Sequence, residues 1–151
     1  MVTTQLLAVG EQWLYDSMEG LFAEHSMAVE LRTRFAGITD RLDENPPELF
    51  LMDPILAMIE AGINPAQSIA DIAIYGAPKK RYSFGVIYRE MRKRGIPVVV
   101  FTAGFEGGED RLELMYGIKQ GRDYDHFIPM PIPEDRFFDR LHRILLVKAQ
   151  G

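Results

Sequence analysis

The sequence contains no cysteine, which excludes a disulfide framework, a thiolate nucleophile and a zinc site built on thiolates. Its three histidines, His25, His126 and His142, are scattered without motif spacing, so a histidine-rich metal cage is not expected. No apolar run approaches the roughly 20 residues that a membrane-spanning helix requires. The first residues carry neither a basic segment nor a long apolar stretch, so no secretory signal peptide is predicted. We therefore expect a cytoplasmic protein that does not enter the membrane.

The residues that are present are typical of a globular protein. The length of 151 residues suits one domain, since domains commonly have about 100–200 residues. Hydrophobic residues make up 47% of the chain, enough to bury a core, so extensive disorder is not expected. The formal net charge of −5 disfavours nonspecific binding to nucleic acid, because phosphates carry the same sign of charge.

Apolar runs and amphipathic stretches alternate along the chain. Short apolar runs bounded by glycine, proline or charged residues predict strands at 5–9, 27–31, 49–52, 69–75, 96–102 and 127–130. Apolar residues at helical spacing predict helices at 11–25, 35–42, 54–61, 83–94, 110–120 and 134–147. This alternation predicts a doubly wound α/β fold of three layers, in which helices cover both faces of a parallel sheet.

Four segments carry a shared pattern: LLAVGEQ, ELFLMDP, SFGVIYREMRKRGIPVVVFTAG and HFIPMPIPEDRFFDRLHRIL. Together they resemble the receiver domain of bacterial response regulators, and the resemblance covers nearly the whole chain. The first strand of that family ends in paired acids and is matched here by LLAVGEQ. The third strand ends in a phosphoacceptor aspartate and is matched by ELFLMDP. The third helix and fourth strand, which ends in Thr/Ser-Ala, are matched by SFGVIYREMRKRGIPVVVFTAG. The fifth strand, the usual Lys-Pro and the last helix are matched by HFIPMPIPEDRFFDRLHRIL. The resemblance implies a flavodoxin-like, five-stranded single domain with an insertion after the third strand, at about 54–81.

The resemblance also implies roles for individual residues. Asp53 would be the carboxylate that accepts a phosphoryl group, and Asp53 and Glu11 would hold Mg²⁺, a cation that prefers oxygen ligands. Thr102 would donate a hydrogen bond to a phosphoryl oxygen. Phe127 lies where the family often has a switch aromatic, and the glycine-rich segment 104–108 would rearrange.

The chain departs from the family pattern at two of these positions. Gly10 replaces the second acid, so Mg²⁺ loses one ligand, and Met130 replaces the lysine that would pair with the phosphoryl group. The interval from Asp53 to Thr102 is longer than in ordinary receivers. In a second register, 69–75 is the third strand, Gly76 lies at the acceptor position and no acceptor remains. We prefer Asp53, because its distance from the second strand fits one short helix.

Each assignment has a purely structural alternative. Asp53 before Pro54 suits a helix N-cap, and Glu11 suits the first turn of a helix, where a carboxylate complements the helix dipole. Met130 and Phe127 suit core packing. The basic residues at 79–81 and 89–94 form either a solvated helix face or a docking surface for an acidic partner.

These features predict a response-regulator-like signalling protein of a bacterial two-component-type pathway, not a turnover enzyme. In one hypothesis, a histidine kinase or phosphotransfer protein phosphorylates Asp53 in the presence of Mg²⁺. The added charge then alters binding of a downstream protein partner or formation of a homodimer. In the alternative, phosphorylation is lost and the domain is a protein–protein interaction module. Gly10 and Met130 favour the second hypothesis, whereas Asp53 and Thr102 favour the first. A small α/β enzyme is not expected, because no other catalytic motif is present.

Overall fold

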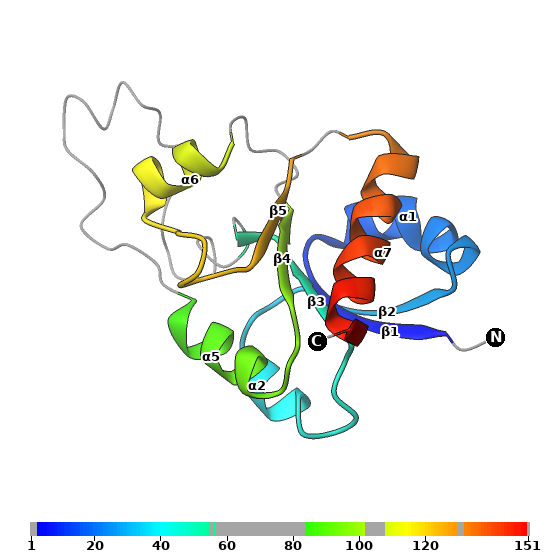
Figure 1. Cartoon of the computed structure of the whole chain (residues 1–151), viewed down its shortest axis with the longest axis horizontal. Coiled ribbons are helices and arrows are strands. Elements are labelled where there is room, and N and C mark those ends of the chain that lie inside the picture. Colours follow the sequence, from blue (N-terminus) through cyan, green and yellow to red (C-terminus); the bar gives the residue numbers. More distant parts are fainter. Residues whose placement is uncertain (1–2, 55, 57–83, 102–107, 130–131, 151) are drawn as a thin grey trace.

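The computed structural model describes residues 3–54, 56, 84–101, 108–129 and 132–150 (Figure 1). Its strands are β1 (Thr4–Val9), β2 (Met27–Arg32), β3 (Leu49–Met52), β4 (Val98–Phe101) and β5 (His126–Ile128). Its helices are α1 (Gln12–Glu24), α2 (Ile38–Arg41), α5 (Gly85–Lys93), α6 (Glu109–Tyr116) and α7 (Glu134–Gln150). No helix in these ranges is long and apolar enough to cross a membrane.

The five strands form one parallel sheet in the order β2-β1-β3-β4-β5, which confirms the predicted doubly wound fold. The strand between β1 and β4 is β3, in which Leu51 pairs with Ala8 on one side and Val99 on the other. Asp53 therefore directly follows the central strand of the sheet. The strand predicted at 69–75 lies outside the described residues, as does nearly all of the helix predicted at 54–61.

Alternate residues of each strand face opposite sides of the sheet, and each side has its own apolar core. Phe50 and Met52 of β3 pack with residues of α2 and α5, whereas Leu49 and Leu51 pack with residues of α1 and α7. Figure 1 shows α1 and α7 together on one side of the sheet and α2 and α5 together on the other. Both faces are covered, which explains why the inner strands β3 and β4 consist entirely of buried apolar residues.

Several elements end at different residues than predicted. Helix α6 ends at Tyr116, not at 120, because Gly117 adopts a left-handed φ of 73° and its N–H bonds to the Glu113 carbonyl. Strand β5 ends at Ile128 and is followed by Pro129, which has no N–H for the sheet. Helix α2 begins only at Ile38, after Gly37, and covers four residues of the predicted 35–42.

Two aspartates that the sequence did not single out connect α5 to neighbouring segments. Asp123 is fully buried: its Oδ1 accepts the Phe84 N–H at 2.8 Å, and its Oδ2 accepts the Lys119 N–H at 2.9 Å. The Arg122 guanidinium also donates to Oδ2 of Asp123. The start of α5 is thereby joined to the segment between α6 and β5.

Asp125 makes the second connection. Its Oδ1 accepts the Tyr88 hydroxyl at 2.6 Å, and its Oδ2 accepts the Val98 N–H at 2.9 Å. Burial raises the pKa of Tyr88, and the hydrogen bond to the Asp125 carboxylate raises it further. The Tyr88 hydroxyl is therefore held protonated as a donor, which fixes α5 against the start of β4.

Candidate functional site

The carboxyl ends of β1 and β3 lie side by side at one edge of the sheet. Val9 pairs with Met52, and the Asp53 N–H donates to the Val9 carbonyl at 2.9 Å. The Gly10 N–H donates to the Arg32 carbonyl at 3.1 Å, which extends the pairing of β1 with β2 by one residue. Two of the predicted site positions, Gly10 and Asp53, therefore follow neighbouring strands. Ligand sites of open α/β sheets lie at this edge.

Asp53 is buried, with only 3% of its surface exposed. In the described part of the chain, the only other buried charged residue is Asp123, whose role is structural. Placing a carboxylate inside a protein costs free energy unless it is well paired, so such groups are often functional. Its burial and its place at the carboxyl end of the central strand make Asp53 the leading candidate in the site.

Glu11 is exposed and occupies the N-cap position of α1. Its backbone is extended, with φ of −79° and ψ of 141°, and its side chain makes no capping hydrogen bond. If Glu11 serves only to start the helix, its carboxylate acts there through its interaction with the helix dipole and not through a capping hydrogen bond. The carboxylate is placed beside the carboxyl end of β1, where it can serve as a metal ligand.

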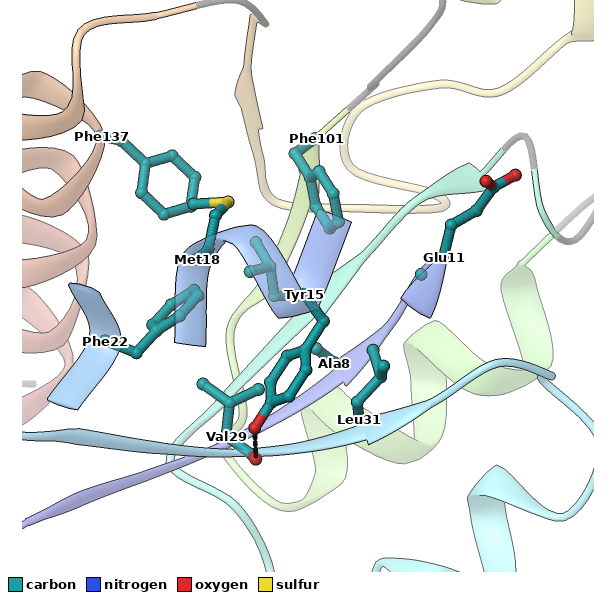
Figure 2. Close-up of a pocket in the computed structure, with 11 residues that line it drawn as sticks. Ala8, Glu11, Tyr15, Met18, Phe22, Val29, Leu31, Phe101 and Phe137 are labelled. Atoms are coloured by element: carbon teal, nitrogen blue, oxygen red, sulfur yellow. Dashed lines mark hydrogen bonds between the residues drawn. The ribbon is translucent and has the colours of Figure 1, made fainter. Parts of the chain in front are cut away.

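An aromatic ring lies beside the position where the family has its second acid. A Cβ atom built on Gly10 would lie 3.2 Å from Cζ of Phe101, the last residue of β4. This contact is tight but involves the far end of a side chain, so a small shift of the ring would relieve it. The Phe101 ring belongs to the apolar core on the side of the sheet that α1 covers, and Figure 2 shows the Glu11 carboxylate pointing away from it.

An apolar cavity of about 20 Å³ lies behind this edge, between α1 and the sheet (Figure 2). The Tyr15 hydroxyl donates to the Val29 carbonyl at 3.1 Å, and burial raises the pKa of Tyr15. The cavity is lined by Ala8, Gly10, Glu11, Tyr15, Met18, Phe22, Val29, Leu31, Leu51, Phe101 and Phe137. It has room for about one water molecule, far less than the roughly 300 Å³ of a small-molecule pocket. We therefore do not regard it as a substrate site.

Phe127, at the predicted switch position, is buried in the core on the α5 side of the sheet. Its ring centroid lies 6.4 Å from that of Tyr124, whose hydroxyl donates to Oε2 of Glu109 at 3.2 Å. Burial raises the pKa of Tyr124, and the nearby Glu109 carboxylate raises it further. Phe127 is thus connected through Tyr124 to the start of α6. Its role as a switch stays a prediction.

The other predicted site residues, Thr102, Met130 and the segment 104–107, lie outside the described residues. Within the described ranges, no group of three or more histidine, aspartate or glutamate side chains is arranged to hold a metal ion. The two carboxylates, Glu11 and Asp53, nevertheless suit Mg²⁺, which proteins often bind through one or two carboxylates together with water and phosphate oxygens. Binding of Mg²⁺ at this edge stays a prediction.

The basic residues at 89–94 mostly contact side chains of the same protein surface. Glu90 accepts hydrogen bonds from Lys93 at 3.1 Å and from Arg94 at 2.8 Å, and Arg94 also contacts Asp43 at 2.7 Å. The Arg92 guanidinium lies 5.4 Å from the Tyr88 ring centroid. These contacts favour a solvated helix face over a docking surface, while residues 79–81 lie outside the described residues.

The contact between His25 and His142 was not predicted from the sequence. The two residues lie 117 positions apart, and their ring nitrogens are 3.5 Å from each other. Neither histidine is part of a motif. The sequence also gave no reason to single out Asp123 and Asp125, since their partners are distant backbone and hydroxyl groups. No local pattern could have revealed these contacts.

The strand order and the helices on both faces of the sheet define a doubly wound, flavodoxin-like α/β domain. A receiver protein from Burkholderia phymatum has a TM-score of 0.60 at 13% identity over 95% of both chains. The receiver domain of the TMAO respiratory regulator TorR has a TM-score of 0.60 at 16% identity, covering 95% of this chain and 98% of that one. NtrX from Brucella abortus has a TM-score of 0.63 at 16% identity, covering 99% of this chain but 28% of that one. No protein-family model and no curated protein matches the sequence. At these identities the likeness establishes the fold.

Proposed function

We propose that the protein is a receiver-type signalling domain that accepts a phosphoryl group on Asp53. The observation that carries this proposal is the buried aspartate directly after the central strand β3, beside the carboxyl end of β1. In the transfer, a carboxylate oxygen of Asp53 bonds to phosphorus while the bond from phosphorus to the donor's histidine nitrogen breaks. The donor would be a histidine kinase or a phosphotransfer protein.

Glu11 and Asp53 would hold Mg²⁺, which when bound neutralises negative charge on the phosphoryl group. Gly10 offers no side-chain ligand and Met130 offers no cation. The chain therefore supplies less charge stabilisation than the family pattern would. We expect phosphorylation to require high Mg²⁺ or a specific donor.

Phosphorylation would add negative charge at the buried edge of the sheet and alter the packing around it. Phe127 and Tyr124 provide a route from the core to α6, because Tyr124 bonds to Glu109 in the first turn of that helix. The output would be a change in the binding of a downstream protein or of a second copy of the chain.

The first test is intact-mass analysis after incubation with acetyl phosphate and Mg²⁺. We expect one phosphoryl adduct on the wild type and on Asp139→Asn, and none on Asp53→Asn. Asp139 is a matched control, since it is an exposed aspartate on α7 that pairs only with Arg143 among the interactions described. Absence of an adduct on folded wild type, with acetyl phosphate and with a panel of histidine kinases, would contradict the proposal.

A second candidate function is a phosphorylation-independent interaction module of the same fold. The observation that favours it is the replacement of one acid by Gly10, with the ring of Phe101 lying against that position. In this case Asp53 would be a structural buried carboxylate, and Asp53→Asn would leave partner binding unchanged.

Restoring the missing acid should strengthen magnesium binding. We expect Gly10→Asp to lower the Mg²⁺ dissociation constant about tenfold, equivalent to ~1.4 kcal/mol, because it adds a carboxylate beside Glu11 and Asp53. Binding can be measured by calorimetry or by the fluorescence of Trp13, the single tryptophan.

Gly20→Asp is the matched control, because it adds the same charge on α1 at a position with nothing within 4 Å of the new Cβ. An equal gain in both variants would show a general effect of net charge. No gain in Gly10→Asp would argue against a metal site at this edge.

A further inference from the structure

The end of α1 and the middle of α7 bring two histidines into contact. His25 directly follows the last residue of α1, and His142 lies on α7. Nδ1 of His25 and Nε2 of His142 are 3.5 Å apart. His142 is exposed and His25 is half-buried, so the space beside the two nitrogens is open to solvent and ions.

The separation of the two nitrogens suits a shared metal ion better than a direct hydrogen bond. Hydrogen bonds from N–H groups in proteins are commonly about 2.7–3.2 Å long, so 3.5 Å is long for one. Two imidazole nitrogens bound to one tetrahedral Zn²⁺ at about 2.0–2.1 Å lie about 3.3 Å from each other. The observed separation is therefore close to that of two imidazole nitrogens that share one ion.

Packing holds both rings near this position. The His25 ring stacks on Phe138, with centroids 4.0 Å apart and planes 8° from parallel. Phe138 is fully buried, and its ring centroid lies 5.2 Å from that of Phe22 on α1. His142 lies four residues after Phe138 on α7, on the same face of the helix. The two ligands therefore need little ordering before an ion binds.

The local charge also favours a cation. The carbonyl groups at the carboxyl end of a helix carry partial negative charge, and His25 lies at that end of α1. Asp139 and Arg143 flank His142 on α7 and form an ion pair of 3.0 Å, so their charges largely offset each other.

We propose that His25 and His142 form a binding site for a divalent transition-metal ion that imidazole prefers, namely Zn²⁺, Ni²⁺ or Cu²⁺. Within the described residues no third side chain of a metal-binding type joins them. Water molecules therefore complete the coordination, and the bound ion exchanges with ions in solution. The bound ion links the end of α1 to α7. This site is independent of Asp53 and Glu11, whose oxygen ligands select Mg²⁺.

The test is calorimetric titration of the full chain with Zn²⁺ and Ni²⁺. We expect one ion per chain in the wild type and affinity at least about tenfold weaker in His25→Gln and in His142→Gln, since each removes a direct ligand. His126→Gln, which changes the third histidine, on β5, should bind as the wild type does. The ion should raise the thermal midpoint of wild type and His126→Gln only.

Two further measurements separate this site from others. Mg²⁺ should not compete, and Asp53→Asn should keep the Zn²⁺ site, so failure of the phosphoacceptor proposal would leave this one standing. Ni²⁺ should broaden the imidazole NMR resonances of His25 and His142 before that of His126. Equal affinity in wild type and His142→Gln, or no saturable binding to folded wild type, would overturn the proposal.

Discussion

Asp123→Ala is expected to lower the free energy of unfolding by about 2–5 kcal/mol. The substitution removes the acceptor of two backbone N–H groups, those of Phe84 and Lys119, and the partner of the Arg122 guanidinium. A buried donor left without its acceptor costs about 1–3 kcal/mol. The loss should be concentrated at the start of α5, where Phe84 is 1% exposed and water cannot easily replace the carboxylate.

Urea denaturation followed by circular dichroism would measure this effect. Asp43→Ala is the matched control, because it removes an aspartate that contacts Arg94 at 2.7 Å but is largely exposed. Exposed ion pairs contribute little, so the control should stay close to wild type. Amide hydrogen exchange at Phe84 should accelerate in Asp123→Ala and not in Asp43→Ala. Similar stability of the two variants would show that Asp123 does not hold the loop.

Phe50→Ala is expected to lower the free energy of unfolding by about 3–5 kcal/mol, the usual range for truncating a buried phenylalanine. Phe50 is fully buried at the centre of β3, paired with Leu7 on one side and Val98 on the other. Its ring packs edge-on against Phe35 with centroids 6.5 Å apart. Since domains of this kind are stable by about 5–15 kcal/mol, this single change could remove a large part of the total.

The control for this prediction is Val86→Ala on α5. Val86 also loses apolar atoms, but 64% of its surface is exposed, so little buried area is lost. Both variants can be compared by the midpoint and slope of the same denaturation curves. A loss below about 1 kcal/mol in Phe50→Ala would mean that the core on the α5 side repacks easily, contrary to the dense packing expected of an interior.

The sequence was most informative where structure depends on near neighbours along the chain. The apolar run 49–52 predicted β3 to the residue, because four consecutive apolar residues between polar segments suit a strand buried on both faces. The ends of helices were less predictable. Whether α6 continued past Tyr116 depended on Gly117 adopting a left-handed conformation, which glycine permits but does not require.

The candidate site was predictable in outline for a geometric reason. Carboxyl ends of adjacent parallel strands meet at one edge of a sheet, so the order of the strands places Asp53 beside the end of β1. The burial of Asp53 and the Phe101 ring against Gly10 could not be predicted, because both depend on how the helices and β4 pack around that edge. The roles of Thr102, Met130 and Phe127 stay predictions.

By itself, then, the sequence determined the class of fold and the strand that ends before Asp53, whereas the structure decided that this strand is the third and central one. The strand and the fold class follow from hydrophobic periodicity and from the handedness of parallel crossovers. Only the tertiary structure decided that Asp123 anchors α5, that Asp125 holds Tyr88, and that His25 meets His142. Such contacts join residues that are distant in the chain. They depend on side-chain directions after the helices have docked, which no local pattern encodes.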